Sequence, residues 1–386
     1  MTETEKTIVI RVAQQMADVD AAQWDALGGD DHPFVSHAFL NALEESGSAT
    51  ADTGWMPQHV LIEDAEGKLI GGAPLYLKTH SQGEYIFDHG WAEAFERAGG
   101  QYYPKALVAV PFTPATGPRL LVAPDAPETT KQTLLAGCME VCRRIDISTL
   151  HINFLSEEDW QMCGEAGLLQ RTSEQFHWVN QGYKTFDDFL ADLASRKRKA
   201  IRKERQGALA SGELEIETIC GNDITEEHWD AFFGFYMDTG SRKWGRPYLT
   251  RDFFSRISAT VGDRVILFMV RRAGRYIAGA LNLASSECLY GRYWGCVEDH
   301  PFLHFEVCYY RAIDYAIEHG LARVEAGAQG PHKLARGYLP VHTYSAHWIR
   351  DGGFRQAVER YLVQEREHID EEIEYLEGRG PFRKSE

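Results

Sequence analysis

The sequence predicts a mixed α/β protein built from two domains of the same design. Its 386 residues exceed the size at which one hydrophobic core keeps growing, so two domains of roughly 150 to 200 residues are expected. The order helix, helix, strands, helix, strand is predicted twice along the chain. A short segment also repeats, because residues 67–73 align with residues 274–280 with four identities in seven positions. Together these observations favour a duplicated domain.

The first half begins with a short alternating strand and two amphipathic helices. Ser36 precedes the second helix and is expected to cap it through its side-chain oxygen. In order, the predicted elements are a strand at 8–12, helices at 21–27 and 36–46, strands at 59–63, 69–78 and 85–88, a helix at 130–144 and a strand at 149–154.

The second half repeats this order behind a basic helix. Its predicted elements are helices at 226–238 and 250–260, strands at 265–271, 276–284 and 289–296, a helix at 305–319 and a strand at 322–326. We place the domains at 1–180 and 181–386, the second starting with a linking helix at 186–210. A long charged helix at 355–376 carries a narrow apolar stripe, which would pack on the body or on a second subunit of a homodimer.

Composition narrows the classes of function. With 44% hydrophobic and 25% charged residues the chain is globular, and its net charge of -17 disfavours nonspecific binding to DNA or an anionic membrane. No apolar run approaches the roughly 18 residues of a membrane span, and no signal peptide is visible. The seven cysteines are scattered and odd in number, as expected for reduced thiols. These features predict a cytoplasmic protein.

Several uncommon blocks resemble one family. They are YYPK at 102–105, VPFTP at 110–114, RKWGRPYL at 242–249, YGRYWG at 290–295, HFE at 304–306 with YY at 309–310, and EAGAQGPHK at 325–333 with RG at 336–337. The resemblance is to the FemAB-like N-acyltransferases of the GNAT superfamily, of the peptidoglycan biosynthesis and recognition type. It runs from about residue 33 to residue 360.

The resemblance implies tandem GNAT-like domains and transfer of an acyl group to an amine. Fem transferases pass an amino acid from aminoacyl-tRNA to the amine of a peptidoglycan precursor. The expected co-substrate is therefore aminoacyl-tRNA or acyl-CoA, and the expected acceptor a small-molecule or peptide amine. No metal or permanently bound cofactor is implied. The sequence departs from acetyl-CoA enzymes at 297–306, where three acids and no glycine replace the usual glycine-rich phosphate loop.

Four polar residues of the second repeat are candidates for the catalytic groups. Acyl transfer needs a base for the amine proton, and Glu325 and His332 follow a predicted strand at the edge where ligands bind in open sheets. Lys333 lies beside them, and Glu306 begins the connecting helix. Two interpretations remain open for Glu306, since acids are also favoured at helix N-termini. His332 could likewise be an ordinary surface histidine.

Further polar and aromatic residues are candidates for substrate binding. Arginines bind carboxylates or phosphates, and aromatic rings stack on ligands. A glycine-flanked strand often marks close approach of a ligand to the backbone. The candidates are Arg242, Trp244, Tyr248, Asn282, Arg292, Tyr293, Trp294, His304, Gln329 and Arg336.

A basic run in the linking helix is a candidate contact for tRNA or phosphate. Its residues are Arg196, Lys197, Arg198, Lys199 and Arg202. A solvated helix face explains such a run equally well. A non-catalytic module that binds a peptidoglycan-like peptide or tRNA is the alternative to an enzyme, and an acyl-CoA enzyme with an unusual phosphate site is a third hypothesis.

Overall fold

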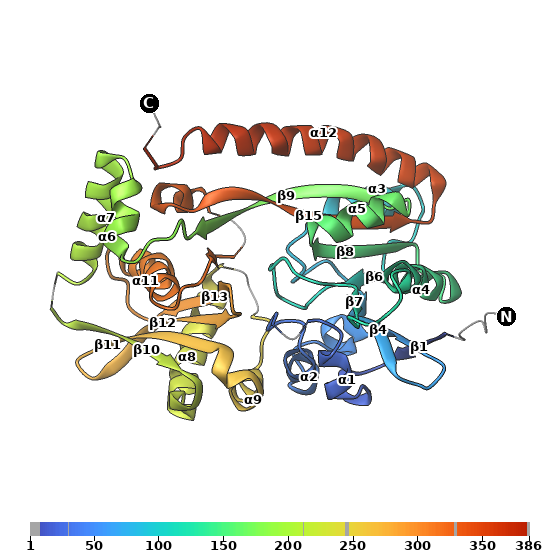
Figure 1. Cartoon of the computed structure of the whole chain (residues 1–386), viewed down its shortest axis with the longest axis horizontal. Coiled ribbons are helices and arrows are strands. Elements are labelled where there is room, and N and C mark those ends of the chain that lie inside the picture. The colour runs from blue at the N-terminus through green and yellow to red at the C-terminus, as the bar shows by residue number, and fades with distance from the viewer. Residues whose placement is uncertain (1–7, 30, 211, 244–246, 328–329, 384–386) are drawn as a thin grey trace. The chain divides into compact units, whose positions relative to one another are not determined.

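The chain divides into two compact units, each with helices (Figure 1). Each unit has its own hydrophobic core. The computed structural model describes residues 8–29, 31–210, 212–243, 247–327 and 330–383. Unit 1 comprises residues 1–173 and 343–370, and unit 2 comprises residues 174–342 and 371–386. This differs from the predicted division at 180/181. The reason is strand β15 (Leu339–Ile349), which returns to pair with β8 (Thr149–Leu155) of unit 1.

Unit 1 holds two sheets, ordered β1-β3-β4-β7 and β15-β8-β6-β5-β2. Its helices are α1 (Ala21–Asp25), α2 (His37–Glu45), α3 (His89–Arg97), α4 (Thr130–Arg144) and α5 (Glu157–Glu165). Its other strands are β1 (Val9–Ala13), β2 (Trp55–Pro57), β3 (His59–Glu63), β4 (Leu69–Ala73), β5 (Leu75–Lys78), β6 (Lys105–Val108) and β7 (Leu121–Val122). Buried side chains of β3, β8 and α4 form one continuous core.

Some predictions for unit 1 are confirmed and others are wrong. α4 has the predicted bounds, and Ser36 Oγ accepts the Phe39 amide at 3.3 Å at the start of α2. The predicted strand at 69–78 is broken, because Pro74 lacks the N–H that a continuing strand needs. Residues 85–88 form no strand, since Tyr85 adopts a left-handed φ of 60°.

Unit 2 is built on one mixed sheet in the order β10-β11-β12-β13-β14-β9, antiparallel except where β13 and β14 meet. Its strands are β9 (Leu169–Val179), of which residues 174–179 lie in this unit, β10 (Leu214–Cys220), β11 (Val265–Arg272), β12 (Arg275–Ala284), β13 (Cys288–Cys296) and β14 (Arg323–Glu325). Its helices are α6 (Phe186–Asp192), α7 (Ser195–Ala208), α8 (Glu226–Lys243), α9 (Arg251–Val261), α10 (Leu303–Phe305) and α11 (Arg311–Glu318).

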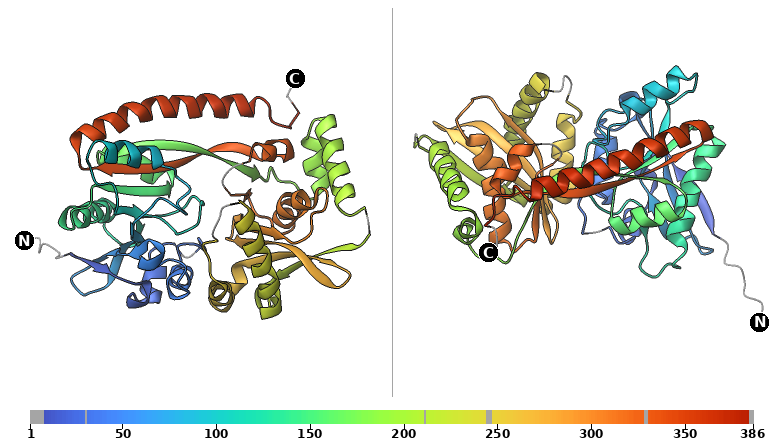
Figure 2. Two further views of the ribbon diagram at one scale, coloured as in Figure 1. Left: turned by 180° about the vertical axis from the view of Figure 1, so that it is seen from behind. Right: turned by 90° about the horizontal axis from the view of Figure 1, so that it is seen from above.

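Two predicted helices differ from the structure. The linking helix at 186–210 is two helices, because Leu193 is extended and bridges to Phe382, while the Ala194 amide donates to Pro381 O at 2.9 Å. The helix at 305–319 contains a π-helical turn, η5 (Glu306–Tyr310), between α10 and α11. The C-terminal helix α12 (Gly352–Glu377) is continuous, and it is slightly longer than the predicted 355–376 (Figure 2).

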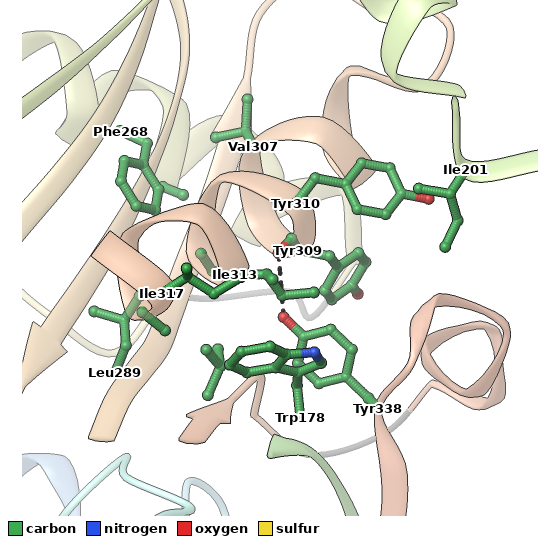
Figure 3. Close-up of a cluster of buried hydrophobic side chains, with 14 of the residues drawn as sticks. Trp178, Ile201, Phe268, Leu289, Val307, Tyr309, Tyr310, Ile313, Ile317 and Tyr338 are labelled. Carbon is green, nitrogen blue, oxygen red and sulfur yellow. Dashed lines mark hydrogen bonds between the residues drawn. The ribbon is translucent and has the colours of Figure 1, made fainter. Parts of the chain in front are cut away.

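The core of unit 2 fixes the position of the π-helical turn. Buried side chains from strands, among them Phe268 and Leu289, pack with Ile313 and Ile317 of α11 (Figure 3). The Tyr338 hydroxyl donates to the Tyr309 carbonyl oxygen at 3.3 Å within this cluster. α8 packs against β13, where a Cβ at Gly295 would lie 2.4 Å from the backbone of Phe235. Both contacts fix segments that border the candidate functional site.

Candidate functional site

Strands β13 and β14 separate after a short parallel pairing. Cys288, Leu289 and Tyr290 pair with the three residues of β14, and the ladder between the two strands ends there. On its other side β13 carries a bulge, since Leu281 pairs with Tyr293 whereas Asn282 pairs with Gly291. Arg292 is the extra residue. The separation opens the sheet beside a distorted strand, an arrangement that re-aims side chains at ligand sites.

A small cavity of about 90 Å³ lies at this opening. Its lining comes from β12, β13, the start of the connecting helix and the residue after β14. The lining residues are Ala280, Leu281, Asn282, Gly291, Arg292, Tyr293, Trp294, His304, Cys308, Tyr309 and Ala326. Five predicted substrate-binding residues, Asn282, Arg292, Tyr293, Trp294 and His304, thus come together around one cavity.

Aromatic rings and one amide give this cavity its character. The His304 ring lies 5.5 Å from that of Trp294 and 5.4 Å from that of Tyr309, measured between centroids. Asn282 is buried, its Nδ2 donates weakly to Ile266 O at 3.4 Å, and its Oδ1 lies 3.6 Å from where a Cβ of Gly291 would be. A small polar group that contacts the faces of aromatic rings would fit between such walls.

Glu325 lies at the end of β14, next to the cavity-lining Ala326. It is 3% exposed, and its Oε1 accepts a hydrogen bond from Arg323 Nε at 3.0 Å. His177 Nε2 is 3.8 Å from Glu325, and burial lowers the pKa of this histidine. Glu325 Oε2 accepts no hydrogen bond from the described residues. A buried carboxylate oxygen without a donor can accept a hydrogen bond from a ligand.

His332 and Lys333 hold the other side of the opening. His332 Nε2 contacts the Tyr309 hydroxyl at 2.9 Å, and Lys333 Nζ donates to Gly327 O at 2.7 Å. Neither residue is among those that line the cavity, and the same is true of Glu325 and Glu306. Burial raises the pKa of Tyr309. The tyrosine hydroxyl therefore remains protonated at neutral pH and reaches the cavity in place of His332.

The buried ammonium group of Lys333 should make the stability of the folded protein depend on pH. Burial lowers its pKa from 10.5 to about 8. Between these pH values the folded protein binds fewer protons than the unfolded chain, so this residue makes stability rise with pH. We expect Lys333→Met to lose that rise, by up to about 1.4 kcal/mol per pH unit, in urea unfolding between pH 8 and 10.5. Parallel pH profiles of the two proteins would contradict this assignment.

Glu306 is occupied by ion pairs within the unit. It is 1% exposed, and both its oxygens accept hydrogen bonds from Arg205, at 2.9 and 3.1 Å. Arg311 Nε lies 3.2 Å from the same carboxylate. A Cβ at Gly207 of α7 would lie 3.0 Å from the Phe302 ring, directly before α10. The end of α7 therefore covers the start of the connecting helix, and these contacts favour the helix-terminus interpretation of Glu306.

The remaining predicted binding residues have varied surroundings. Arg336 stacks on Phe305 at 3.4 Å, pairs with Glu204 and donates to His332 O at 2.7 Å, so it braces the His332 loop. The Tyr248 amide donates to the Tyr236 hydroxyl at 3.0 Å, next to Tyr293. Trp244 and Gln329 lie outside the described residues, as does the side chain of Arg242.

The basic run lies on α7. Arg196, Lys199 and Arg202 are exposed, while Lys197 and Arg198 are half-buried. Arg202 pairs with Asp187 at 2.9 Å. The exposed side chains occupy one helix surface, as both interpretations of the run require.

The equivalent opening in unit 1 is filled by the chain itself. There β6 and β8 form the parallel pair, from Ala106 with Leu150 to Val108 with Ile152. Beyond it the fully buried Arg119 donates to Asn153 O at 3.0 Å and to Ala115 O at 2.6 Å. This plug favours unit 2 as the place for chemistry.

A buried ionic cluster of unit 1 was not predicted from the sequence. Lys105 Nζ donates to Glu84 at 2.7 Å, to Ser81 at 2.8 Å and also to Asp88. Lys78 Nζ stacks on Trp55 at 3.7 Å. Burial lowers the pKa of Lys78 to about 7 and raises that of Glu84 to about 7. Both lysines are fully buried, and Lys105 lies in the YYPK block.

A family model described as FemAB-like, peptidoglycan biosynthesis/recognition, matches residues 15–384. The chain belongs to the FemAB-like family. Among solved structures, FemX is similar to this FemAB-like protein at 14% identity, over 88% of this chain and 98% of its own, with a TM-score of 0.55. The C-terminal domain (DUF2156) of a putative lysylphosphatidylglycerol synthetase from Agrobacterium fabrum is similar at 11% identity, over 91% of this chain and 97% of its own, with a TM-score of 0.53.

These likenesses establish a shared fold. A tandem GNAT protein from the clavulanic acid biosynthesis pathway is similar at 12% identity, over 89% of this chain and 98% of its own, with a TM-score of 0.45, too low to support an inference. No curated protein matches the sequence. The predicted mixed α/β fold is confirmed, and this FemAB-like protein shares its fold with FemX. Within the described ranges, no helix is both long and apolar enough to cross a membrane.

Proposed function

We propose that this FemAB-like protein transfers an aminoacyl or other acyl group from an activated donor, aminoacyl-tRNA or acyl-CoA, onto a primary amine at the opening between β13 and β14. The observation that carries the proposal is the cavity at this opening, together with Glu325, the residue before the cavity-lining Ala326, whose Oε2 accepts no hydrogen bond from the described residues. Peptidoglycan biosynthesis or recognition, the description of the family, makes a peptide amine the natural acceptor.

The chemistry uses Tyr309 of the cavity lining and Glu325, which precedes the cavity-lining Ala326. The amine nitrogen attacks the carbonyl carbon of the donor, and the new C–N bond forms as the bond to the leaving oxygen or sulfur breaks. Glu325 takes the amine proton. The leaving atom receives a proton from the Tyr309 hydroxyl, which His332 holds at 2.9 Å. Attack is direct, without an intermediate bound to the enzyme.

Three features support aminoacyl-tRNA over acyl-CoA. A helix N-terminus that holds a pyrophosphate needs free amides and no acid. Here the start of the connecting helix carries the buried Glu306 carboxylate and is covered by Gly207 of α7. The rings of Trp294, His304 and Tyr309, with the Asn282 amide, also suit the ammonium group of an aminoacyl donor. The exposed basic residues of α7 are a surface that tRNA phosphates would recognise.

An assay with several acyl donors, each added separately, tests the proposal. Purified protein is mixed with a lysine-containing peptidoglycan-type peptide and, separately, with alanyl-tRNA, acetyl-CoA and longer acyl-CoAs, and the peptide is weighed by mass spectrometry. We expect a mass increase of one acyl group with at least one donor. The second candidate function, a module that only binds the peptide, is favoured by the occupied helix start. It predicts a peptide-induced rise in melting temperature with no product from any donor.

A further inference from the structure

A second cavity lies in unit 1, and no residue of the parallel pair β6–β8 lines it. It is a groove of about 380 Å³ between the segment after β1, helix α2 and the edge strand β2. This volume is in the range of small-molecule sites. All twelve of its lining residues are described, and none of them belongs to the ionic cluster or to the plugged opening of unit 1.

One part of the groove wall is apolar. Ala17, Ala49, Ala51, Met56 and Pro57 contribute it, and Met56 is 41% exposed although it is a large apolar side chain. Walls of this kind suit a short chain of methylene groups, since burying each CH₂ contributes about 0.8 kcal/mol.

The polar lining is acidic and rich in acceptors. Glu44 and Glu45 are its charged members, and no lysine or arginine is among them. Asn41 Oδ1 is buried and accepts no hydrogen bond from the described residues. The groove therefore offers a negative field and an unsatisfied acceptor, which is the complement of a ligand that donates hydrogen bonds and carries positive charge.

The Glu44 carboxylate is held in place by three hydrogen bonds and can accept one more. Its Oε1 accepts from His59 Nε2 at 2.8 Å and from the Tyr76 hydroxyl at 3.2 Å, and its Oε2 accepts from the Met16 amide at 2.6 Å. A carboxylate has about four acceptor positions, so one remains on Oε2. Since the three contacts come from different segments, the carboxylate is fixed before any ligand arrives.

We infer that this groove binds a primary alkylammonium group, with its methylenes along the apolar wall and its ammonium between Asn41, Glu44 and Glu45. The ligand class is an ω-aminoalkyl chain, either a free amine or the side chain of a lysine-like residue in a peptide. Binding here is separate from the acyl transfer proposed for unit 2 and does not depend on it.

Titration with matched probes tests the inference by ligand-observed NMR on the full chain. The probes are pentylamine, pentanol, pentanoate and Nα-acetyl-lysine methylamide. We expect saturable binding of pentylamine, weaker binding of pentanol and none of pentanoate. The lysine derivative separates the two sources, since binding at least as tight as that of pentylamine points to a peptide side chain, and weaker binding to a free amine.

Variants of the groove connect the binding to this place. Asn41→Leu and Glu45→Gln should each weaken pentylamine binding about tenfold, because the first removes a hydrogen-bond acceptor and the second removes a negative charge beside the ammonium group. Glu96→Gln, an exposed acid on α3, is the matched control and should bind as the parent does. Melting temperatures within a few degrees of the parent show that the variants fold. Equal affinity for pentanol and pentylamine, or unchanged affinity in both groove variants, overturns the inference.

Discussion

Lys105→Met should lower the free energy of unfolding of unit 1 by about 3 to 5 kcal/mol, the range for removing one partner of a buried ion pair. The ammonium is fully buried and donates to Glu84, Asp88 and Ser81. Without it, two carboxylates remain in a medium that disfavours charge, and Lys78 is the nearest cation to Glu84, at 3.9 Å. Urea denaturation followed by tryptophan fluorescence measures the loss.

The matched control is Lys68→Met. Lys68 pairs with Asp125 at 2.8 Å, yet the two side chains are 53% and 70% exposed. An exposed pair contributes at most about 1 kcal/mol, so this variant should unfold nearly as the parent does. Equal effects of the two substitutions would show that the Lys105 cluster is not buried in the folded protein.

Glu325→Gln and His332→Ala should each lower the rate of acyl transfer about 100-fold or more while the protein stays folded. Glutamine keeps the contact with Arg323 Nε but cannot take a proton, and general base catalysis contributes roughly 10² to 10⁴. Removing His332 leaves the Tyr309 hydroxyl without the partner 2.9 Å away that orients it. Initial rates with the donor that works best in the assay with several donors measure both effects.

Glu318→Gln and His319→Ala make the same chemical changes at exposed positions near the end of α11. Both controls should retain the activity of the parent. Full activity of Glu325→Gln together with His332→Ala would remove these residues from the mechanism, even if transfer itself is observed.

Sequence periodicity located most of the fold. The bounds of α4 agree with the prediction, and most strands of unit 2 agree to within one residue, because apolar residues dominate their buried faces. β9 escaped prediction for the opposite reason. It buries Arg171, Gln175 and His177, polar residues that a search for apolar strands passes over. Strand β15 returns to unit 1 over nearly two hundred residues, a pairing that no local pattern reveals.

The site was predicted in part. Glycines beside Arg292, Tyr293 and Trp294 correctly marked a distorted strand, which the bulge explains. Cys308 and Tyr309 also line the cavity, and their π-helical turn shifts them from the register that a period of 3.6 residues predicts. The ionic cluster of unit 1 could not be predicted, because lysines and acids are ordinarily exposed.

Native mass spectrometry of the protein with aminoacyl-tRNA, CoA and acyl-CoAs, each added separately and followed by an acceptor peptide, tests the proposed transfer most directly. The proposal predicts that the protein retains one donor and that the mass of the peptide increases by the acyl group of that donor. Retention of aminoacyl-tRNA would implicate the basic surface of α7, and retention of acyl-CoA would place the phosphate site away from Glu306. A protein that holds the peptide but modifies it with no donor would contradict the proposal and identify a recognition module.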